Sequence, residues 1–441
     1  MASVRLALCC LVLLACMLPL GVARDAMTVT DGAGAAPTID GRMDDPAWEA
    51  APWSEAFSDI NGPEKLVPRH ATRMKMLWDD QYLYIGLWND EPHPWANLTL
   101  HDSIIYKDNA VEVFIDPDSD NHNYYEVEVN ALGTMWDLFL TKPYRDGAAV
   151  LHNWETLEPA RPTMADGPIG SDGRPTGWRP MRHAVWVDGA LNDGSGGNSK
   201  GWGVEMAIPW SVLGMASFRP SPPAPGDQWR VQFSRVQWIV RWDVRARVYV
   251  KAPPQQEATW YVWTPQHEDQ MHKPEVWGYV QFSSAPAVAN ATVTAAAAAT
   301  TNATTTGGSN NEVASTATEA ETETTKAAET TETDATKAAA GAAGAVFVPD
   351  PSWPLRSFLM QGYYAQAKRK AASQPFAGSM EELGLEPPER VHAVRPLVQA
   401  TEASFIVSAQ MPAPVGTDTL RYYVNEEGRI TWRAVTAAEG D

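Results

Sequence analysis

In the stretch 106–130, hydrophobic residues occupy every second position on both sides of a polar loop: Val111, Val113 and Ile115, then Tyr125, Val127 and Val129. A period of two is typical of β-strands, because successive side chains of a strand point to opposite faces. The stretch therefore predicts a β-hairpin with one apolar face and one polar face. The polar face would carry Glu112, Glu126, Glu128 and Asn130.

The same alternation recurs at short intervals between residues 27 and 284. It predicts further strands at 74–78, 83–87, 134–140, 202–208, 229–233, 260–263 and 277–282. Within this region the helical pieces are expected to be short, such as those at 46–50 and 211–213, and long loops are expected at 159–180 and 189–201. Many short strands without helical periodicity favour an all-β fold. We predict an antiparallel, jelly-roll-like β-sandwich over 27–284.

The composition changes abruptly after this region. Residues 285–345 consist mainly of Ala, Thr and Glu with almost no large apolar residue, which predicts a disordered linker. Apolar residues return over 346–441, with helical spacing at 353–370. Further strands are expected at 405–407, 420–424 and 430–433, so this end of the chain is predicted to be a small α+β unit.

The first 23 residues have the pattern of a secretory signal peptide. Arg5 precedes an apolar run that ends at Leu20, and small residues follow. The alternative is a lipoprotein motif that ends at Cys16. All three cysteines lie in this segment, so the mature chain would have no disulfide. We expect a secreted or cell-surface protein with no membrane span after cleavage. Potential N-glycosylation sequons begin at Asn97, Asn290 and Asn302.

The charge of the chain excludes some partners. With 34 basic and 54 acidic residues, its formal net charge is -20, and it lacks the basic character that nucleic acids and anionic membranes select. The 19 tryptophans suit either sugar stacking or an apolar core, so their number alone does not identify a ligand.

A set of short segments occurs in order over residues 37–283. The segments are PTIDG at 37–41, DPAW at 45–48, YLYI at 82–85, DNAVEVFID at 108–116, NALGT at 130–134, GALN at 189–192, GWGVEMAIPW at 201–210, FSR at 233–235, WTP at 263–265 and WGYVQF at 277–282. As an ordered set, these segments resemble family 9 carbohydrate-binding modules.

The resemblance implies a β-sandwich that binds the ends of sugar chains between aromatic rings, and it also implies structural calcium. The two aromatic positions of the family fall here on Tyr106 and Trp263, and a sugar-binding carboxylate falls on Glu112. This chain departs from the family in having Tyr at position 106 in place of Trp. It also has Glu128 at the position aligned with a sugar-binding Arg.

The candidate sugar site therefore comprises Tyr106, Glu112, Asn130, Arg235 and Trp263. Two of these residues have structural alternatives, since Trp263 suits the core and Arg235 suits an ion pair with Glu112. We expect a secreted, non-catalytic carbohydrate-binding protein that binds oligosaccharides or polysaccharides and is linked to their breakdown.

Two other functions remain open. Glu112 and Glu128 could act as the carboxyl pair of a glycoside hydrolase, which needs two carboxyl groups across a cleft. Alternatively, the chain could be a structural surface protein whose sugar site is degenerate, which the Glu at position 128 favours.

Two acidic clusters are candidates for structural calcium. The alternating carboxylates of Asp116, Asp118 and Asp120 could bind Ca²⁺ through oxygen, or could simply form a solvated hairpin tip. The second cluster is Asp40, Asp44 and Asp45. The nine histidines show no paired zinc spacing, and no other cofactor is expected.

Overall fold

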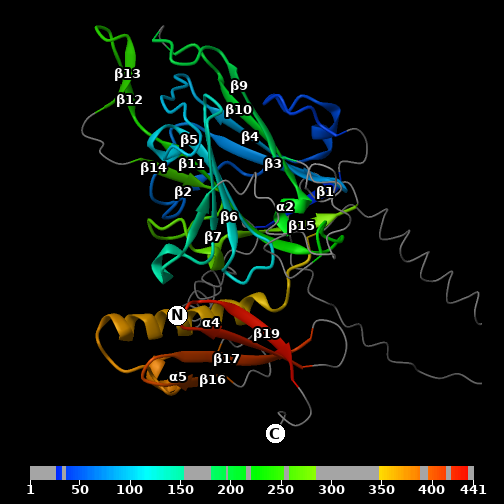
Figure 1. Ribbon diagram of the computed structural model, residues 1–441, viewed down its shortest axis with the longest axis vertical. Helices are drawn as coiled ribbons and strands as arrows, with labels where there is room; N and C mark the ends of the chain where they lie inside the picture. The colour runs from blue at the N-terminus through cyan, green and yellow to red at the C-terminus, as the bar shows by residue number, and fades with distance from the viewer. Residues whose placement is uncertain are drawn as a thin grey trace, which may run out of the picture.

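The computed structural model describes residues 26–31, 36–152, 180–194, 197–214, 220–252, 258–284, 347–387, 396–413 and 419–435 (Figure 1). The predicted signal peptide, the predicted linker and most of the predicted loop at 159–180 lie outside these residues. The described part of the chain forms a β-sandwich and, after it, a C-terminal unit of helix and sheet (Figure 1).

The sandwich is built from one large sheet of 13 strands. These are β1 (Ala26–Asp31), β2 (Ser58–Asp59), β3 (Thr72–Trp78), β4 (Tyr82–Asp90), β5 (Ala110–Asp116), β6 (Tyr124–Asn130), β7 (Met135–Leu140), β8 (Val150–His152), β9 (Arg182–Asp188), β10 (Gly201–Pro209), β11 (Gln228–Gln237), β14 (Thr259–Val262) and β15 (Gly278–Ser283). A separate hairpin comprises β12 (Val240–Asp243) and β13 (Val248–Lys251).

The sheet curls so that its two halves face each other. The main strand order is β8-β7-β6-β5-β11-β15-β1-β3-β4-β10-β9. The main core lies between the halves, where Val111, Val113 and Val127 pack in one cluster with Ile85 and Val204. The apolar residues of the predicted hairpin thus point into the sandwich, and the polar residues between them point outward.

The predicted all-β class is confirmed, with local differences in the strands. β1 pairs in parallel with both β15 and β3, although an antiparallel sheet was expected. We did not predict β1, β2, β8, β9, β12 and β13, because they are short or lack a regular alternation. The short helical pieces are η1 (Pro46–Ala50), η2 (Ile105–Lys107), η3 (Tyr144–Asp146), η7 (Pro274–Val276) and α2 (Trp210–Leu213).

The C-terminal unit has the predicted α+β character. Its sheet has the order β16-β17-β18-β19, and α4 covers one face. None of the helices in the described ranges is both long and apolar enough to cross a membrane. The elements are α4 (Trp353–Ala371), α5 (Met380–Leu383), β16 (Leu397–Ala400), β17 (Phe405–Pro412), β18 (Thr419–Asn425) and β19 (Ile430–Ala434).

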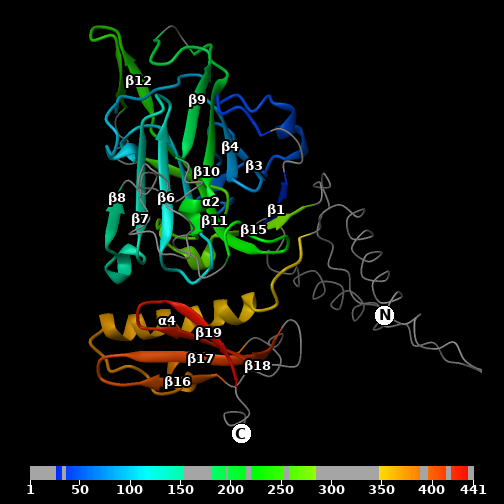
Figure 2. The ribbon, with the colours of Figure 1, turned by 45° about the vertical axis from the view of Figure 1, so that its right-hand side comes forward.

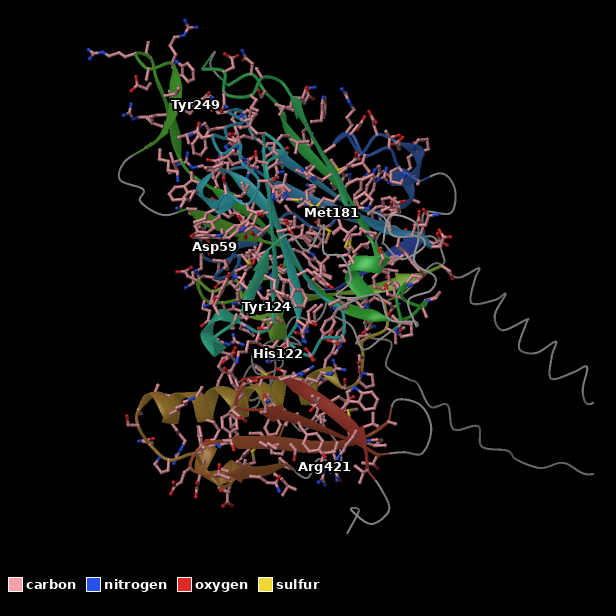
Figure 3. The ribbon with its side chains drawn as sticks, viewed as in Figure 1. Asp59, His122, Tyr124, Met181, Tyr249 and Arg421 are labelled. Carbon is pink, nitrogen blue, oxygen red and sulfur yellow. The ribbon has the colours of Figure 1, made fainter. Side chains whose placement is uncertain are left out.

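The C-terminal unit is docked on one end of the sandwich, and α4 lies between the sandwich and the C-terminal sheet in both ribbon views (Figure 2). Trp353 stacks on Tyr279 of β15, with ring centroids 3.6 Å apart. Arg429 forms an ion pair with Asp120 at 2.8 Å. His122, two residues further along, lies at the end of the sandwich that faces the C-terminal unit (Figure 3).

Candidate functional site

Three glutamates lie together on the outward face of β5 and β6. Glu112 on β5 is the register partner of Glu128 on β6, and Glu126 lies two positions before Glu128 on the same strand face. All three side chains are buried, with 2–3% of their surface exposed. The predicted polar face therefore exists, but other parts of the chain cover it.

These carboxyl groups form the floor of a cavity of about 220 Å³, which we call the glutamate cavity. The volume is below the roughly 300–1,000 Å³ of pockets for drug-sized ligands, so it suits a short ligand. Its aromatic walls are Tyr106, Trp136, Tyr144 and Trp260, and further lining residues are Ile60, Phe114, Leu138, Asp269, Met271 and His272. Tyr106 and Tyr144 are 37% and 45% exposed, so they form a rim that solvent reaches.

The glutamates have specific hydrogen-bond donors. The backbone N–H of Tyr106 donates to Glu128 Oε2 at 2.7 Å. The hydroxyl of Ser234, which lies opposite Glu112 on β11, donates to Glu112 Oε2. Trp260 also hydrogen-bonds Glu112. These contacts connect the glutamate floor to the rim at Tyr106 and to the wall at Trp260.

Burial changes the acidity of all three groups. It raises the pKa of Glu112 to about 7, although the hydrogen bonds from Ser234 and Trp260 oppose the shift. Burial also raises the pKa of Glu126 and of Glu128 well above the ordinary range, and the negative charge of Glu112 adds to both shifts. Glu126 and Glu128 are hydrogen-bonded to each other, as expected when one of two neighbouring carboxyls holds a proton.

His272 lies beside this floor as a neutral ring. Burial, together with the positive charge of Arg145, lowers its pKa to about 3. Its Nδ1 is 3.0 Å from the Tyr124 hydroxyl, and its Nε2 is 4.0 Å from Glu126 Oε2. Tyr144 packs against the same ring in an edge geometry at 4.5 Å between centroids. The cavity therefore combines aromatic surfaces with groups that can donate and accept hydrogen bonds.

Two of the five residues predicted for the sugar site, Tyr106 and Glu112, line the glutamate cavity. Trp263 does not belong to the described lining. It is 7% exposed and packs edge-on against Phe233 in the main core, at 5.9 Å between ring centroids. This geometry therefore supports the alternative in which Trp263 is a core residue.

Arg235 and Asn130 also lie away from the glutamate cavity. Arg235 is fully buried and forms an ion pair with Glu91 at 2.9 Å. The ion pair with Glu112, which was the structural alternative for Arg235, is wrong, because Arg235 lies opposite Val111 and so points to the other face of the sheet.

Asn130 shapes the loops at the end of β6. Its Nδ2 donates to the Leu98 carbonyl oxygen at 2.9 Å, and its Oδ1 accepts from the N–H groups of Leu132 and Thr134. These bonds give Asn130 a structural role close to the polar face.

Sequence reasoning missed most of the cavity lining, including four ring-bearing residues, Trp136, Tyr144, Trp260 and His272. Two of them follow a usable signal, because Trp136 is the register partner of Glu128 and Trp260 lies inside the short strand that ends at Val262. Strand alternation places Trp260 and Val262 on one face and leaves the neighbouring Trp263 after the strand. The other two, Tyr144 and His272, lie in loops, where residue spacing gives no direction.

The glutamates approach a ligand from one side. Glu112 and Glu128 lie on adjacent strands of one cavity floor, where register partners have Cβ atoms roughly 4.5–5.5 Å apart. A glycoside hydrolase instead places its two carboxyl groups on either side of the scissile bond. The arrangement suits hydrogen bonding to a row of hydroxyl groups better than it suits hydrolysis.

Asp116, Asp118 and Asp120 converge at the far end of the same hairpin. Their nearest carboxylate oxygens lie within 4.8 Å of one another. Asp116 accepts the N–H groups of Ser119 and Asn121, and Asp120 accepts Nε of Arg429, so these carboxylates already have donors. Burial, with the charge of Asp118, raises the pKa of Asp120 to about 6.

A cation would fit the charge of this cluster, and these three residues would hold it. Calcium at this site stays a prediction. In the described ranges, the second group of this kind is His101, Asp102 and Asp137, and Asp40, Asp44 and Asp45 belong to neither group.

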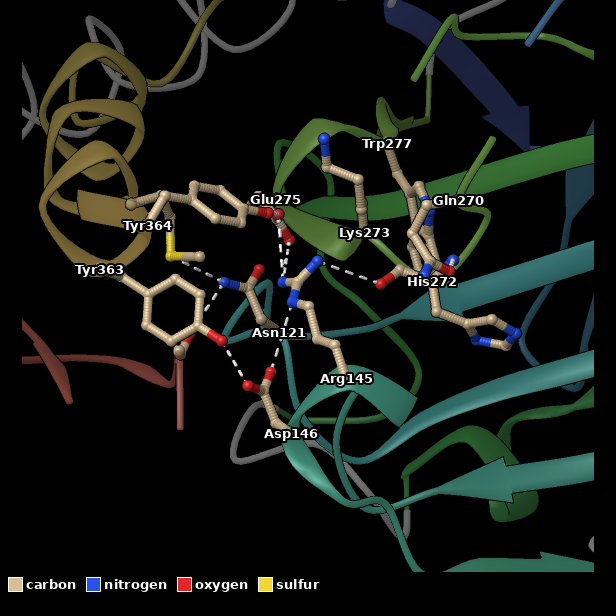
Figure 4. Close-up of polar contacts among 12 residues, drawn as sticks. Asn121, Arg145, Asp146, Gln270, His272, Lys273, Glu275, Trp277, Tyr363 and Tyr364 are labelled. Carbon is tan, nitrogen blue, oxygen red and sulfur yellow. Dashed lines mark hydrogen bonds and ion pairs between the residues drawn. The ribbon is translucent and has the colours of Figure 1, made fainter. Parts of the chain in front are cut away.

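The C-terminal unit contacts the wall of the glutamate cavity (Figure 4). The hydroxyl of Tyr364 on α4 donates to Glu275, and the hydroxyl of Tyr363 donates to Asp146. Arg145 joins the two contacts, since its Nη2 lies 3.1 Å from both carboxylate oxygens of Glu275 and its Nε lies 3.4 Å from Asp146 Oδ2. Arg145 is next to Tyr144, and Glu275 follows His272 by three residues. The helix α4 therefore braces two segments that line the cavity.

Comparison with known proteins supports the family resemblance over one region of the chain. No curated protein matches the chain. Among solved structures, it is similar to a Bacteroides uniformis protein, with 14% identity, a TM-score of 0.38, and coverage of 59% of this chain and 99% of that chain. It is also similar to a family 9 carbohydrate-binding module from Caldicellulosiruptor kristjanssonii in complex with cellotriose, with 14% identity, a TM-score of 0.33, and coverage of 59% and 94%. The resemblance noted in the sequence is confirmed, because residues 39–141 match the family described as carbohydrate family 9 binding domain-like.

Proposed function

We propose that this chain is a non-catalytic carbohydrate-binding protein and that the glutamate cavity is its sugar site. The observation that supports this most is the combination of three buried carboxyl groups with aromatic side chains around one small cavity. Carboxyl groups bind sugar hydroxyls, and aromatic faces contact the C–H groups of a pyranose ring. The match of residues 39–141 to the carbohydrate family 9 binding domain-like family supports the same function.

The roles of the residues follow from their positions. Trp260 and Trp136 line opposite flanks of the glutamate floor, on β14 and β7, so they would enclose a sugar ring between them. Tyr106 and Tyr144 would contact the ligand at the rim, where they are partly exposed. Glu112 and Glu128 would accept hydrogen bonds from hydroxyl groups that point to the floor. The limited volume favours the end of an oligosaccharide or polysaccharide chain.

Titration calorimetry of the full chain with cellotriose, and with a panel of other short oligosaccharides, tests this proposal. Trp260→Ala should weaken the affinity by about tenfold or more, because a buried aromatic contact is among the strongest single contributions to binding. Trp432→Ala is the matched control, since Trp432 is 57% exposed on the C-terminal sheet. Equal affinities of the two variants would reject the glutamate cavity as the sugar site. A repeat with EDTA would show whether the predicted calcium matters.

A further inference from the structure

A second cavity lies on the outer face of the opposite half of the sandwich. It has a volume of about 450 Å³ and is lined by Arg42, Met43, Trp53, Ala71, Arg73, Trp88 and Asp90. We call it the arginine cavity. Its strands β3 and β4 turn their other face to the main core, so the core separates the two cavities. None of its residues belongs to the glutamate cavity.

The register of three strands places an indole at the centre of this face. Trp88 on β4 lies opposite Arg73 on β3 and opposite Gly203 on β10. A side chain at position 203 would collide with the carbonyl oxygen of Gly41, so glycine is needed where the loop crosses the strand. The Nε1 of Trp88 donates to Asp90 at 2.8 Å, which fixes the orientation of the ring.

A buried carboxylate holds the loop that carries Arg42. Glu205 on β10 is fully buried and accepts the N–H of Gly41 at 2.7 Å, the N–H of Met43 at 3.1 Å and Nε1 of Trp48 at 2.6 Å. The residues on both sides of Arg42 are therefore fixed to the sheet. Such fixation reduces the conformational entropy that the loop would otherwise lose when a ligand binds.

The guanidinium of Arg42 is also positioned. It lies over the ring of Trp186 on β9, 4.6 Å from the ring centroid, and its Nε is 3.6 Å from Asp40. The contact with Asp40 uses Nε, and the two terminal nitrogens of a guanidinium form the fork that matches a carboxylate. Arg42 and Arg73 are both exposed, so an anion can reach them.

The aromatic and cationic groups of this cavity suit one class of ligand. Trp53 is 41% exposed, and the ammonium of Lys75 lies 4.6 Å from its ring centroid. A basic, tryptophan-lined cavity is unexpected on a chain with a formal net charge of -20. A neutral sugar would use the indoles but not the arginines, whereas an acidic sugar offers both an apolar ring face and a carboxylate.

We propose that the arginine cavity is a second carbohydrate site and that it binds acidic saccharides, in which uronic acid residues supply the carboxylate. Trp53 and Trp88 contact the sugar ring, while Arg42 and Arg73 bind the carboxylate. Glu205 is a positioning residue that holds Arg42 through the loop. This site does not depend on the proposed function of the glutamate cavity, because the two cavities share no lining residue.

Titration calorimetry of the full chain with tetragalacturonate tests the proposal, and the methyl-esterified tetrasaccharide is the matched ligand without charge. The wild type should bind the acid and bind the ester at least about tenfold more weakly, because the ester cannot form charge-assisted hydrogen bonds. Affinity for the acid should also fall several-fold when NaCl is raised from about 0.05 M to about 0.5 M.

Substitutions then locate the site. Arg73→Gln and Trp53→Ala should each weaken tetragalacturonate binding by about tenfold, while Arg433→Gln and Trp432→Ala on β19 should leave it unchanged. Circular dichroism checks that each variant is folded. Absence of acid binding by the wild type, or full affinity in both Arg73→Gln and Trp53→Ala, would overturn the proposal. Loss of acid binding in Trp260→Ala alone would assign the acid to the glutamate cavity and also overturn it.

Discussion

The two cavities are built on opposite outer faces of one sandwich, and they differ in how their charged groups meet water. The carboxyl groups of Glu112, Glu126 and Glu128 are almost completely buried, so desolvation raises their pKa values. The guanidinium groups of Arg42 and Arg73 are exposed and stay charged. The same strand architecture thus presents acids that can hold protons on one face and permanent cations on the other.

The difference comes from the segments that cover each face. Over β5 and β6, the η3 segment and residues 269–272 cover the glutamates. Over β4 and β10, the loop at 40–48 is anchored by one carboxylate, Glu205, and leaves Arg42 at the surface. A covered floor recognises hydroxyl groups through short hydrogen bonds, and an open basic surface recognises negative charge. The strands therefore supply positions, and the covering segments determine the chemistry.

Replacing Trp263, a residue of the main core, should have the largest effect on stability and binding. Trp263→Ala removes a buried indole that packs against Phe233, and such changes cost about 3–5 kcal/mol of unfolding free energy. Because the core supports both faces, neutral and acidic sugar binding should weaken together when the variant is heated. Urea unfolding and titration of both ligands would check this. A stable variant that loses only neutral sugar binding would instead show that Trp263 contacts the ligand.

The stability of the glutamate face should depend on pH. The pKa of Glu112 is raised from its ordinary 4.5 to about 7, so in this window the folded protein holds a proton that the unfolded chain releases. Stability from this group is therefore complete below pH 4.5 and falls as the pH rises to about 7. The loss is on the order of 3 kcal/mol.

Urea unfolding of wild type and Glu112→Gln between about pH 4 and pH 8 isolates this contribution. Glutamine has no carboxyl proton, so the wild type should lose stability relative to the variant as the pH rises. Parallel stability curves for the two proteins would contradict the raised pKa. Arg73→Gln is the matched variant on the other face, and its curve should run parallel to that of the wild type.

The hairpin that carries Glu112 also shows where sequence reasoning succeeds. The alternation over 106–130 predicted the hairpin, its apolar side and its glutamate side, because strand periodicity fixes which residues share a face. Periodicity says nothing about what covers a face. For that reason the alternation predicted a polar face but not the burial of its three glutamates.

Long-range pairing is the second limit. Arg235 was considered as a partner of Glu112, but the register places it opposite Val111, on the face that reaches Glu91. Position 263 was chosen from the family resemblance, whereas the β14 aromatic that lines the glutamate cavity is Trp260. The Arg235 difference depends on the direction of one side chain, and the Trp263 difference depends on where the strand β14 ends. Alternation with a period of two locates a strand, but it does not fix the end of the strand or the long-range partner of a side chain.

The smallest expected effect tests whether the C-terminal unit supports the glutamate cavity. Tyr364→Phe removes the hydroxyl that donates to Glu275, while the bond from Arg145 to Glu275 remains. One hydrogen bond contributes about 1 kcal/mol, so neutral sugar affinity should fall by no more than about fivefold. Binding of the acidic saccharide should not change, because the arginine cavity lies on the opposite face of the sandwich.

Tyr423→Phe is the matched control for this change. Its hydroxyl accepts a hydrogen bond from Arg433 within the C-terminal sheet and not from the sandwich. If α4 braces the cavity wall, the Tyr364 variant should lose neutral sugar affinity and the Tyr423 variant should keep it. Equal behaviour of the two variants would show that the C-terminal unit only adjoins the sandwich. A selective loss would make it part of the glutamate site, because the hydroxyl of Tyr364 is connected to the cavity wall through Glu275 and Arg145.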